Sequence, residues 1–258
     1  MKPFLSANNI SWKGILHDCN LQIHHGDCVV LIGKNGSGKS SLLRCLSGWN
    51  RIDHGTIDLQ GSPIEKMTPV EKSRHLGLLP QQIHLFDNLP ILEWLGNARF
   101  RFNESWKQSE QHIRSLLQTE NLEHLLQRSW NQLSGGEKQR LALLGLKLQE
   151  TSTWMLDEPG NHLDPKVQLE VYRNLSEAWC AGTTLVLVTH NINLLFQCFP
   201  QSQWETIRTV GIDAGRILFD TPLNHPSLIQ QIGDLYNLTA TMTTLNEIPQ
   251  VLFTLEPS

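Results

Sequence analysis

The chain has 258 residues, of which 21 are basic and 25 acidic, so its formal charge is −4. That length allows one large domain or two small ones with a substantial buried core. The mild negative charge excludes a generally basic surface for nucleic acid, although a local patch stays possible. No apolar run approaches the roughly 20 residues that a membrane-spanning helix needs, and the N-terminus lacks the apolar core of a secretion signal. We therefore expect a soluble cytosolic protein, as the 5 scattered cysteines also indicate.

Short apolar runs alternate with helical stretches along the chain, a pattern typical of a mixed α/β protein. The run Cys28–Ile32 is rich in β-branched residues and ends at a glycine, so it is predicted to be a fully buried strand. A helix is predicted to follow at Ser40–Leu46. Further strands before residue 80 are predicted at Leu5–Trp12, Asn20–Ile23, Thr56–Gly61 and Leu76–Leu79.

Helical character takes over from about residue 83 to residue 132. Apolar residues spaced three and four apart carry this prediction, namely Ile113, Leu116, Leu117, Leu122, Leu125 and Leu126. Strands are predicted again at Thr153–Leu156 and Thr184–Val188, and helices after them at Pro165–Trp179 and Ile192–Phe196. The tail from about residue 221 has one predicted helix, Ser227–Tyr236, and two weak strands.

The segment Gly33–Ser40 matches the phosphate-loop pattern G-x-x-x-x-G-K-S/T, directly after a predicted buried strand and before a predicted helix. Its glycines let backbone N–H groups turn inward around phosphate oxygens, and the helix start adds favourable partial charge. Lys39 is predicted to reach the β- and γ-phosphates, and the Ser40 hydroxyl to bind Mg²⁺. The loop residues predicted to bind ATP are Gly33, Asn35, Gly36, Ser37, Gly38, Lys39, Ser40 and Ser41.

Two carboxylates, Asp157 and Glu158, follow an apolar strand. Asp157 can hold the Mg²⁺ shell at the strand end, and Glu158 can polarise an attacking water. Taken alone, such a pair is most often an exposed turn. A phosphate loop earlier in the chain favours the catalytic interpretation, so the sequence predicts an ATPase.

Between these sites the segment Leu133–Arg140 reads LSGGEKQR. Ser134 is a good helix cap, and Gly135 and Gly136 leave backbone N–H groups bare at a helix start, so this is a second anion site. With the two motifs above, and in the same order, the segment makes nearly the whole chain resemble an ABC-type ATPase cassette. The resemblance implies a head-to-tail homodimer, in which each signature helix closes over the nucleotide on the partner's phosphate loop.

The resemblance assigns further residues one by one. Trp12 resembles the aromatic that stacks on adenine, although an ordinary core tryptophan is an equally good interpretation. Gln81 resembles the glutamine that contacts Mg²⁺ or the lytic water, with Gln82 as the alternative register. Asp164 resembles the acid that crosses the dimer interface, and His190 the histidine that contacts the γ-phosphate. The implied catalytic set is Glu158, His190, Gln81 and Lys39, and the implied metal ligands are Ser40, Gln81 and Asp157.

Two glycines depart from the family's pattern. Gly160 stands where threonine is common after Asp-Glu-Pro, and Gly145 stands where the signature helix commonly carries arginine. A glycine inside a helix costs about 1 kcal/mol relative to alanine, so close helix packing is the expected compensation at Gly145. Neither change removes a chemical group that hydrolysis needs, so we expect the site to be active in hydrolysing ATP.

The resemblance implies a single ABC domain over residues 1–258, with a RecA-like P-loop core, an N-terminal antiparallel β subdomain and an inserted helical subdomain. The core is expected at about 1–82 and 151–220, the helical subdomain at about 83–150, and a C-terminal extension at about 221–258.

A single cassette without membrane spans is similar to the separate engine subunit of a bacterial ABC importer. The resemblance implies polytopic permease subunits docked near Gln81 and the helical subdomain, a substrate-binding protein acting through them, no nucleic acid, and a peripheral place on the cytoplasmic face of the inner membrane. Ile83, Leu85 and Phe86 fit such a docking surface or, equally, simple core packing.

The cargo is suggested by kinship alone. The segment from Asp157 to Asp164 resembles the metal-chelate importers of cobalamin, haem and ferric siderophores. Arg128-Ser129 and Asn131-Gln132, together with the ending from Leu235 to Leu255, most resemble the cobalamin type. Three alternatives stay open: a soluble ABC ATPase of iron–sulfur assembly, a translation or DNA-maintenance ATPase, and a nucleotide-dependent interaction module without catalysis. The sustained heptads or second cassette of the translation and DNA class are not visible in the sequence.

Overall fold

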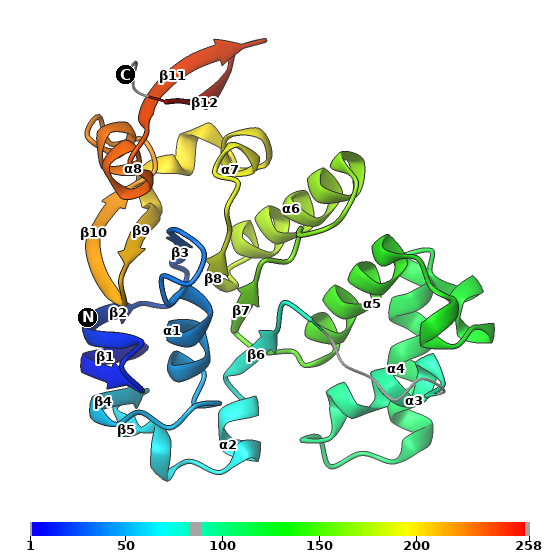
Figure 1. The fold of residues 1–258 in the computed structure, drawn as a ribbon. Coiled ribbons are helices and arrows are strands. Elements are labelled where there is room, and N and C mark those ends of the chain that lie inside the picture. The colour runs from blue at the N-terminus through cyan, green and yellow to red at the C-terminus, as the bar shows by residue number, and fades with distance from the viewer. Residues whose placement is uncertain (1, 83–88, 256–258) are drawn as a thin grey trace.

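The computed structural model describes residues 2–82 and 89–255, so the predicted docking residues Ile83, Leu85 and Phe86 lie outside the described part of the chain. A six-stranded sheet in the order β10-β9-β3-β8-β7-β6 runs through the centre of the molecule (Figure 1). Neighbouring strands are parallel except for the antiparallel pair of β10 with β9. The bounds are β3 Cys28–Ile32, β6 Leu76–Leu79, β7 Thr153–Asp157, β8 Thr184–Val188, β9 Ile207–Asp213 and β10 Arg216–Pro222.

A second, antiparallel sheet in the order β2-β1-β4-β5 lies at the N-terminal end of the chain. Its strands are β1 Leu5–Trp12, β2 Leu16–Ile23, β4 His54–Leu59 and β5 Ser62–Pro63. A two-stranded hairpin of β11 (Thr239–Leu245) and β12 (Ile248–Thr254) ends the described chain and stands out from the body in Figure 1.

The helices divide between the core and a separate block. Those around the sheets are α1 Lys39–Leu46, α2 Pro69–Ser73, α6 Pro165–Cys180, α7 Asn193–Cys198 and α8 Leu228–Tyr236. Those of the block are α3 Ile91–Gly96, α4 Trp106–Thr119 and α5 Gly135–Leu148. Single 3₁₀ turns lie at Ile64–Lys66, Asn97–Arg99, Glu123–Gln127, Trp130–Gln132 and Gln201–Thr206.

Strand β3 is buried on both faces, which is why its sequence is continuously apolar. Because side chains alternate along a strand, Val30 and Ile32 enter the hydrophobic cluster under α6, α7 and α8, whereas Val29 and Leu31 enter the cluster beneath α1 and the antiparallel sheet. The loop after β3 is therefore anchored between the two largest clusters of the molecule.

The helical block has a core of its own, in which Ile113, Leu117 and Leu125 are fully buried. Arg99 links the rest of this block to the end of α5. Its guanidinium donates to the backbone oxygen of Leu148 at 3.2 Å and to the carboxylates of Glu104 and Glu150. The three- and four-residue spacing thus predicted the packed face correctly.

The predicted mixed α/β class is confirmed, but the sequence pattern missed β9 and β10. Strand β2 also begins at Leu16, four residues before the predicted start. No helix among residues 2–82 and 89–255 is both long enough and apolar enough to cross a membrane. The boundaries proposed between core, helical subdomain and C-terminal extension stay a prediction.

Candidate active site

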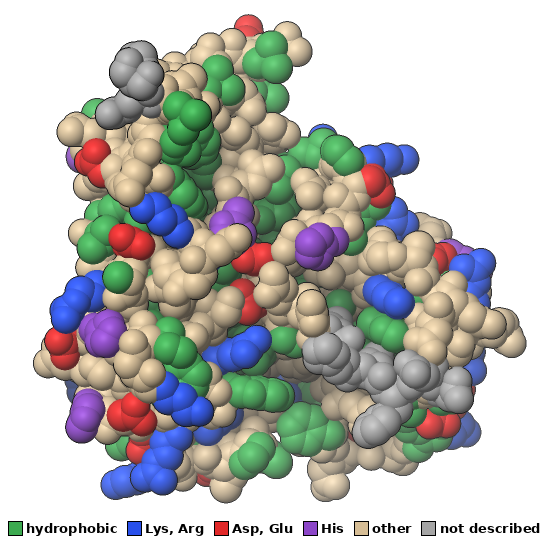
Figure 2. Space-filling model, viewed as in Figure 1, with side chains coloured by type: hydrophobic (Ala, Val, Ile, Leu, Met, Phe, Trp, Pro, Cys, Tyr) green, Lys and Arg blue, Asp and Glu red, His purple; other side chains and the backbone are tan. Residues whose placement is uncertain are grey.

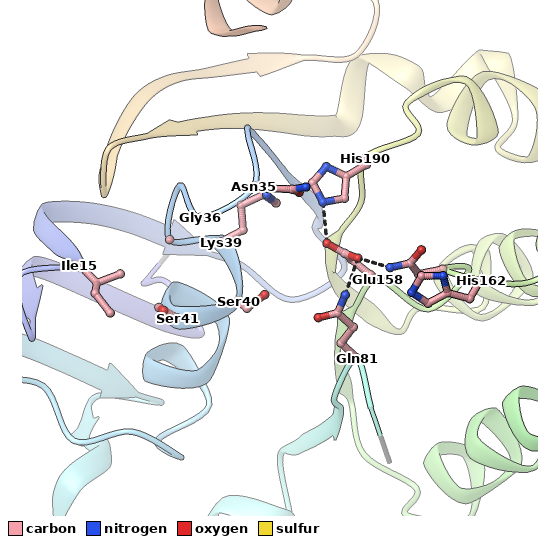
Figure 3. Close-up of a pocket in the computed structure, with 12 residues that line it drawn as sticks. Ile15, Asn35, Gly36, Lys39, Ser40, Ser41, Gln81, Glu158, His162 and His190 are labelled. Atoms are coloured by element: carbon pink, nitrogen blue, oxygen red, sulfur yellow. Dashed lines mark hydrogen bonds and ion pairs between the residues drawn. The ribbon is translucent and has the colours of Figure 1, made fainter. Parts of the chain in front are cut away.

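The phosphate-loop segment joins β3 to α1 and forms one wall of a cavity of about 740 Å³ (Figure 3). Gly38 adopts a φ of 105° at the N-cap of α1, a conformation that glycine takes without strain. The predicted residues that line the cavity are Asn35, Gly36, Gly38, Lys39, Ser40, Ser41, Gln81, Glu158 and His190. On the face of the molecule shown in Figure 2, acidic and histidine side chains gather near the middle.

Lys39 is held inside its own loop. Its side chain is 5% exposed, and its Nζ donates to the backbone oxygens of Gly33 and Lys34, both at 2.9 Å. Burial lowers the pKa of this ammonium, while the carboxylates of Glu158 and Asp157 act in the opposite direction. The loop therefore keeps a cation at the cavity, and no carboxylate of the described residues pairs directly with it.

Ser40 and Asp157 form a buried polar pair, because the Ser40 hydroxyl donates to Asp157 Oδ1 at 2.8 Å. Asp157 is 2% exposed, and its Oδ2 has no hydrogen-bond partner among the described residues. Burial raises the pKa of this carboxyl, which the hydrogen bond from Ser40 partly offsets. An uncompensated carboxylate oxygen beside a hydroxyl is the donor set that Mg²⁺ prefers, so these residues fit the predicted metal.

Glu158 turns sharply out of strand β7. Its φ of 52° is uncommon for a residue with a side chain, and its N–H donates to the backbone oxygen of Val188 at 3.1 Å. The carboxylate accepts from Gln81 at 2.8 Å and Asn161 at 2.7 Å, and its Oε1 lies 2.6 Å from His190 Nε2 (Figure 3). Three elements therefore hold one carboxylate at the cavity wall.

A buried tyrosine bonds the residue that precedes His190. The Tyr172 hydroxyl lies 2.6 Å from Thr189 Oγ1, which also accepts from the N–H of Asn191 at 3.1 Å. Tyr172 is 1% exposed, and a Cβ at Gly160 would lie 3.1 Å from its ring. A side chain at position 160 would therefore press on the buried Tyr172 ring, a contact that the glycine avoids.

The signature residues lie elsewhere on the chain. Ser134 caps α5 by accepting from the N–H of Glu137 at 3.2 Å, and Asp164 caps α6 by accepting from Val167 at 3.1 Å. The two helix starts are close, since a Cβ at Gly136 would lie 3.3 Å from Val167. Ser134, Gly135, Gly136 and Asp164 are not among the described residues that line the cavity.

Other predicted residues differ in where they lie. Trp12 packs beside the core under α1 and is not among the lining residues, whereas Ile15 on the following turn is. Gln81 lines the cavity and reaches Glu158, which favours it over Gln82 as the predicted glutamine. Of the predicted loop residues, Gly33 and Ser37 do not line the cavity. The sequence interpretation missed Ile15, Asn161 and His162 as lining residues.

Sequence relatives agree with this architecture. Residues 16–161 match the family model described as ABC transporter. The hemin import ATP-binding protein of Pseudomonas putida is 35% identical over 188 residues, 70% of this chain and 72% of that protein. The glutamine transport ATP-binding protein of Escherichia coli is 32% identical over 210 residues, 80% of this chain and 84% of that protein.

Solved structures share the fold. A metal-chelate type ABC transporter in an inward-facing conformation matches with a TM-score of 0.77 and 22% identity, over 98% of this chain and 97% of that chain. A dimeric ATP-binding cassette in a post-hydrolysis state, bound to ADP and phosphate, matches with a TM-score of 0.75 and 23% identity, over 86% of this chain and 99% of that chain.

The strand–loop–helix around Lys39 and the acidic end of β7 define a P-loop nucleotide-binding protein with a RecA-like core. The family match makes the assignment specific: the chain belongs to the ABC transporter family and is an ATPase of that class. The predicted cassette fold, with its antiparallel β sheet and helical insertion, is confirmed.

Proposed function

We propose that the chain is the ATP-hydrolysing subunit of an ABC importer that works as a head-to-tail homodimer. The observation that carries the proposal is the Glu158 carboxylate, held by Gln81, Asn161 and His190 across the cavity from Lys39. An oriented carboxylate at a phosphate loop is what hydrolysis of a phosphoanhydride requires. A protein that only bound nucleotide would have no use for it.

The chain's own groups divide the reaction between them. Backbone N–H groups of the loop and the Lys39 ammonium bind the β- and γ-phosphates, and Ser40 and Asp157, with Gln81, would hold Mg²⁺. When bound, Mg²⁺ neutralises charge on the phosphates. Glu158 orients a water and accepts its proton, as the water oxygen bonds to the γ-phosphorus and the bond to the bridging oxygen of ADP breaks. His190 donates to the γ-phosphate oxygens.

The second anion site requires a second copy. The start of α5, with Ser134, Gly135 and Gly136, is not among the described residues that line the cavity of its own chain, and the start of α6 at Asp164 lies close by. A solved cassette with this fold is a dimer bound to ADP and phosphate, which supports a second copy. We propose that each α5 start meets the partner's nucleotide and that each Asp164 lies at the interface. Trp12, whose backbone oxygen accepts from the N–H of the lining residue Ile15 at 2.8 Å, is the proposed adenine contact.

The transport task rests on relatives. Proteins at 32–35% identity are named as import or transport ATP-binding proteins, and one structural match is a metal-chelate type transporter. We infer a permease docked near Gln81 and the helical block on the cytoplasmic face of the membrane, with a substrate-binding protein acting through it. The proposed cargo is a metal chelate such as haem, a ferric siderophore or cobalamin.

Glu158→Gln tests the catalytic assignment. The amide keeps the size of the side chain but cannot accept the water's proton, so we expect ATP to bind with unchanged affinity while hydrolysis falls by about 100-fold or more. Gel filtration with ATP should then show a longer-lived dimer. Glu177→Gln, an exposed change on α6, is the matched control and should hydrolyse ATP at the wild-type rate.

Hydrolysis by Glu158→Gln at the wild-type rate would overturn the catalytic assignment. The importer assignment has a separate readout: the ATPase purified from gently solubilised membranes should carry a polytopic subunit, and in vesicles it should drive uptake of a metal chelate. Recovery only with soluble scaffold proteins would point to an iron–sulfur assembly ATPase instead.

A further inference from the structure

The C-terminal extension, α8 with the β11–β12 hairpin, reaches back to the active site. The apolar face of α8 enters the main core through Leu228, Ile232 and Leu235, and α8 ends at Asn237 with a left-handed φ of 56°. That turn brings the hairpin against the core, where Val251 of β12 is 2% exposed. An isolated two-stranded hairpin is marginally stable in water, so its order depends on these contacts.

The first contact is with the phosphate loop. The Tyr236 hydroxyl accepts from the N–H of Gly33 at 3.2 Å and lies 3.4 Å from the Gly33 carbonyl oxygen, to which it can donate. The Gly33 peptide is closed in on the other side as well, because a Cβ there would lie 2.1 Å from the backbone oxygen of Ile212. Tyr236 therefore helps to fix the backbone of Gly33, the first residue of the loop, on both its N–H and its carbonyl.

This contact matters for Lys39. In the structure the Lys39 ammonium donates to the same Gly33 oxygen, at 2.9 Å. An ammonium has three N–H donors, of which Lys39 uses two on the Gly33 and Lys34 oxygens, so the third is left for phosphate. The Tyr236 hydroxyl lies 3.4 Å from the same Gly33 oxygen, so it helps to fix the carbonyl that holds Lys39.

The second contact is with the segment that carries His190. Asn193 is the first residue of α7, and its side-chain amide bonds the backbone of β12 as a paired strand would. The amide donates to the Val251 oxygen at 3.1 Å and accepts from the Val251 N–H at 2.8 Å. Asn193 is also tied to the loop beside His190, since its own N–H donates to the Asn191 side chain at 3.2 Å.

The two contacts meet on one strand. Phe253, two residues after Val251 on β12, packs edge-to-face on Tyr236 with ring centroids 5.6 Å apart. Residues two apart lie on the same face of a strand, so the strand that bonds Asn193 also supports the ring that bonds Gly33. The extension thus connects the phosphate loop to the histidine segment.

From this geometry we propose that the C-terminal extension is a brace for catalysis, with Tyr236 positioning the phosphate loop and Asn193 positioning His190. The proposal rests on the function proposed above. Neither side chain has to touch the substrate, and each acts through a backbone or loop that does.

Tyr236→Phe and Asn193→Ala separate the two arms of the brace. Because Tyr236→Phe removes the hydroxyl and keeps the ring on Phe253, we expect KM for ATP, and Kd for a fluorescent ATP analogue, to rise about 3- to 10-fold with kcat within about twofold. We expect Asn193→Ala to lower kcat about 5- to 10-fold with little change in Kd, since the loss falls on His190. The full-length chain is used throughout.

Matched controls remove similar groups that face solvent. Gln197→Ala lies one turn further along α7, where its amide donates to the Gln250 side chain at 3.4 Å and to no other described residue. Thr241→Val removes a hydroxyl from the exposed face of the hairpin. Both should match the wild type in kcat and KM. Thermal unfolding of each variant identifies any that lose activity simply by losing folded protein.

The brace would be overturned if Tyr236→Phe lowered kcat alone while Asn193→Ala raised KM and Kd alone. Wild-type kinetics in both variants would overturn it as well. Losses in all four variants that follow their melting temperatures would reduce the extension to a fold-stabilising element. An active wild-type protein with unaffected variants rejects the brace alone. A wild-type protein that binds no ATP rejects the proposed function as well.

Discussion

The nucleotide cavity and the signature surface differ in what holds their polar groups. Around the cavity, the Asp157 and Glu158 carboxylates bond to side chains from other elements and are at most 10% exposed. At the signature, Ser134 and Asp164 are not buried and each bonds the first turn of its own helix. The carboxylates of the cavity are thus held by contacts within the chain, whereas the polar groups of the signature are exposed at its surface.

The difference teaches which parts of the site one chain can preorganise. Groups that must be oriented before substrate arrives are fixed by contacts between elements far apart in sequence, such as Ser40 with Asp157. Among the described residues, the N–H groups of Gly135 and Gly136 have no such side-chain partner. In the proposed dimer, their ligand is the nucleotide on a second copy. The comparison therefore predicts that defects in the two regions complement each other.

Complementation between two inactive variants is the largest expected effect. Lys39→Met removes the loop cation, so ATP binding and hydrolysis should both fall, hydrolysis by about 100-fold or more. Gly135→Asp puts a carboxylate at the first turn of α5, where it suits the helix but repels phosphate, so hydrolysis should fall similarly while ATP still binds. Mixed subunits should regain about a quarter of the wild-type rate, since half the dimers would have one intact site.

The measurement is steady-state phosphate release from co-expressed, differently tagged subunits. Lys107→Met on the exposed start of α4 replaces Lys39→Met in the control mixture, and on its own should match the wild type. If the mixture stays as inactive as its components, the cavity and signature do not join across a dimer, and the comparison fails.

A smaller effect, on stability, is expected at the C-terminal end of α5. Glu104 holds Arg99 at 2.9 Å, and Arg99 holds the last carbonyl of α5, so this ion pair fixes the helix whose start faces the partner. We expect Glu104→Gln to lower the free energy of unfolding at pH 7 by about 2 kcal/mol, the usual worth of hydrogen bonds to charged groups. Glu110→Gln, which breaks only an exposed pair with Arg114, should cost about 0.5 kcal/mol or less.

The pH dependence follows from the same pair. The hydrogen bonds from Arg99, with help from Ser109, lower the pKa of Glu104 from 4.5 to about 2. The stabilisation is therefore complete above the ordinary pKa of the carboxyl and is lost as the pH falls toward about 2. Denaturant unfolding should show the gap between wild type and Glu104→Gln narrowing between pH 5 and pH 3, over about that window. A gap of constant size would assign the loss to packing.

Local signals explain what the sequence predicted well. The buried strand before Gly33, the glycines of the loop and the acids ending β7 are each encoded within a few neighbouring residues. The structure places Gly36, Gly38 and Glu158 at one cavity. The α/β class and the packed face of the helical block followed from hydrophobic spacing for the same reason.

Non-local contacts explain what it missed. Strand β9 interrupts its apolar residues with Arg208 and Gly211. The charge of Arg208 is paired with Asp27 in the turn before β3 and with Asp220 on β10, and Gly211 lies under the Phe219 ring. None of these partners is visible to a local pattern. The contact of Tyr236 with Gly33 spans 203 residues and leaves no sequence signal at all.

Gly160 gives the smallest expected effect and tests how tightly the cavity side is packed. A Cβ there lies 3.1 Å from Tyr172, which is fully buried and bonded to Thr189 beside His190, so the ring has to shift. We expect Gly160→Ala to cost about 1 kcal/mol of stability. Gly160→Thr should cost little more, because a cavity of about 90 Å³ next to Gly160 can take the extra atoms. Thermal unfolding and kcat measure both variants, and Tyr172→Leu should relieve the clash. If Gly160→Ala is neutral in stability and rate, this wall is looser than its buried contacts indicate, and the contrast with the signature surface weakens.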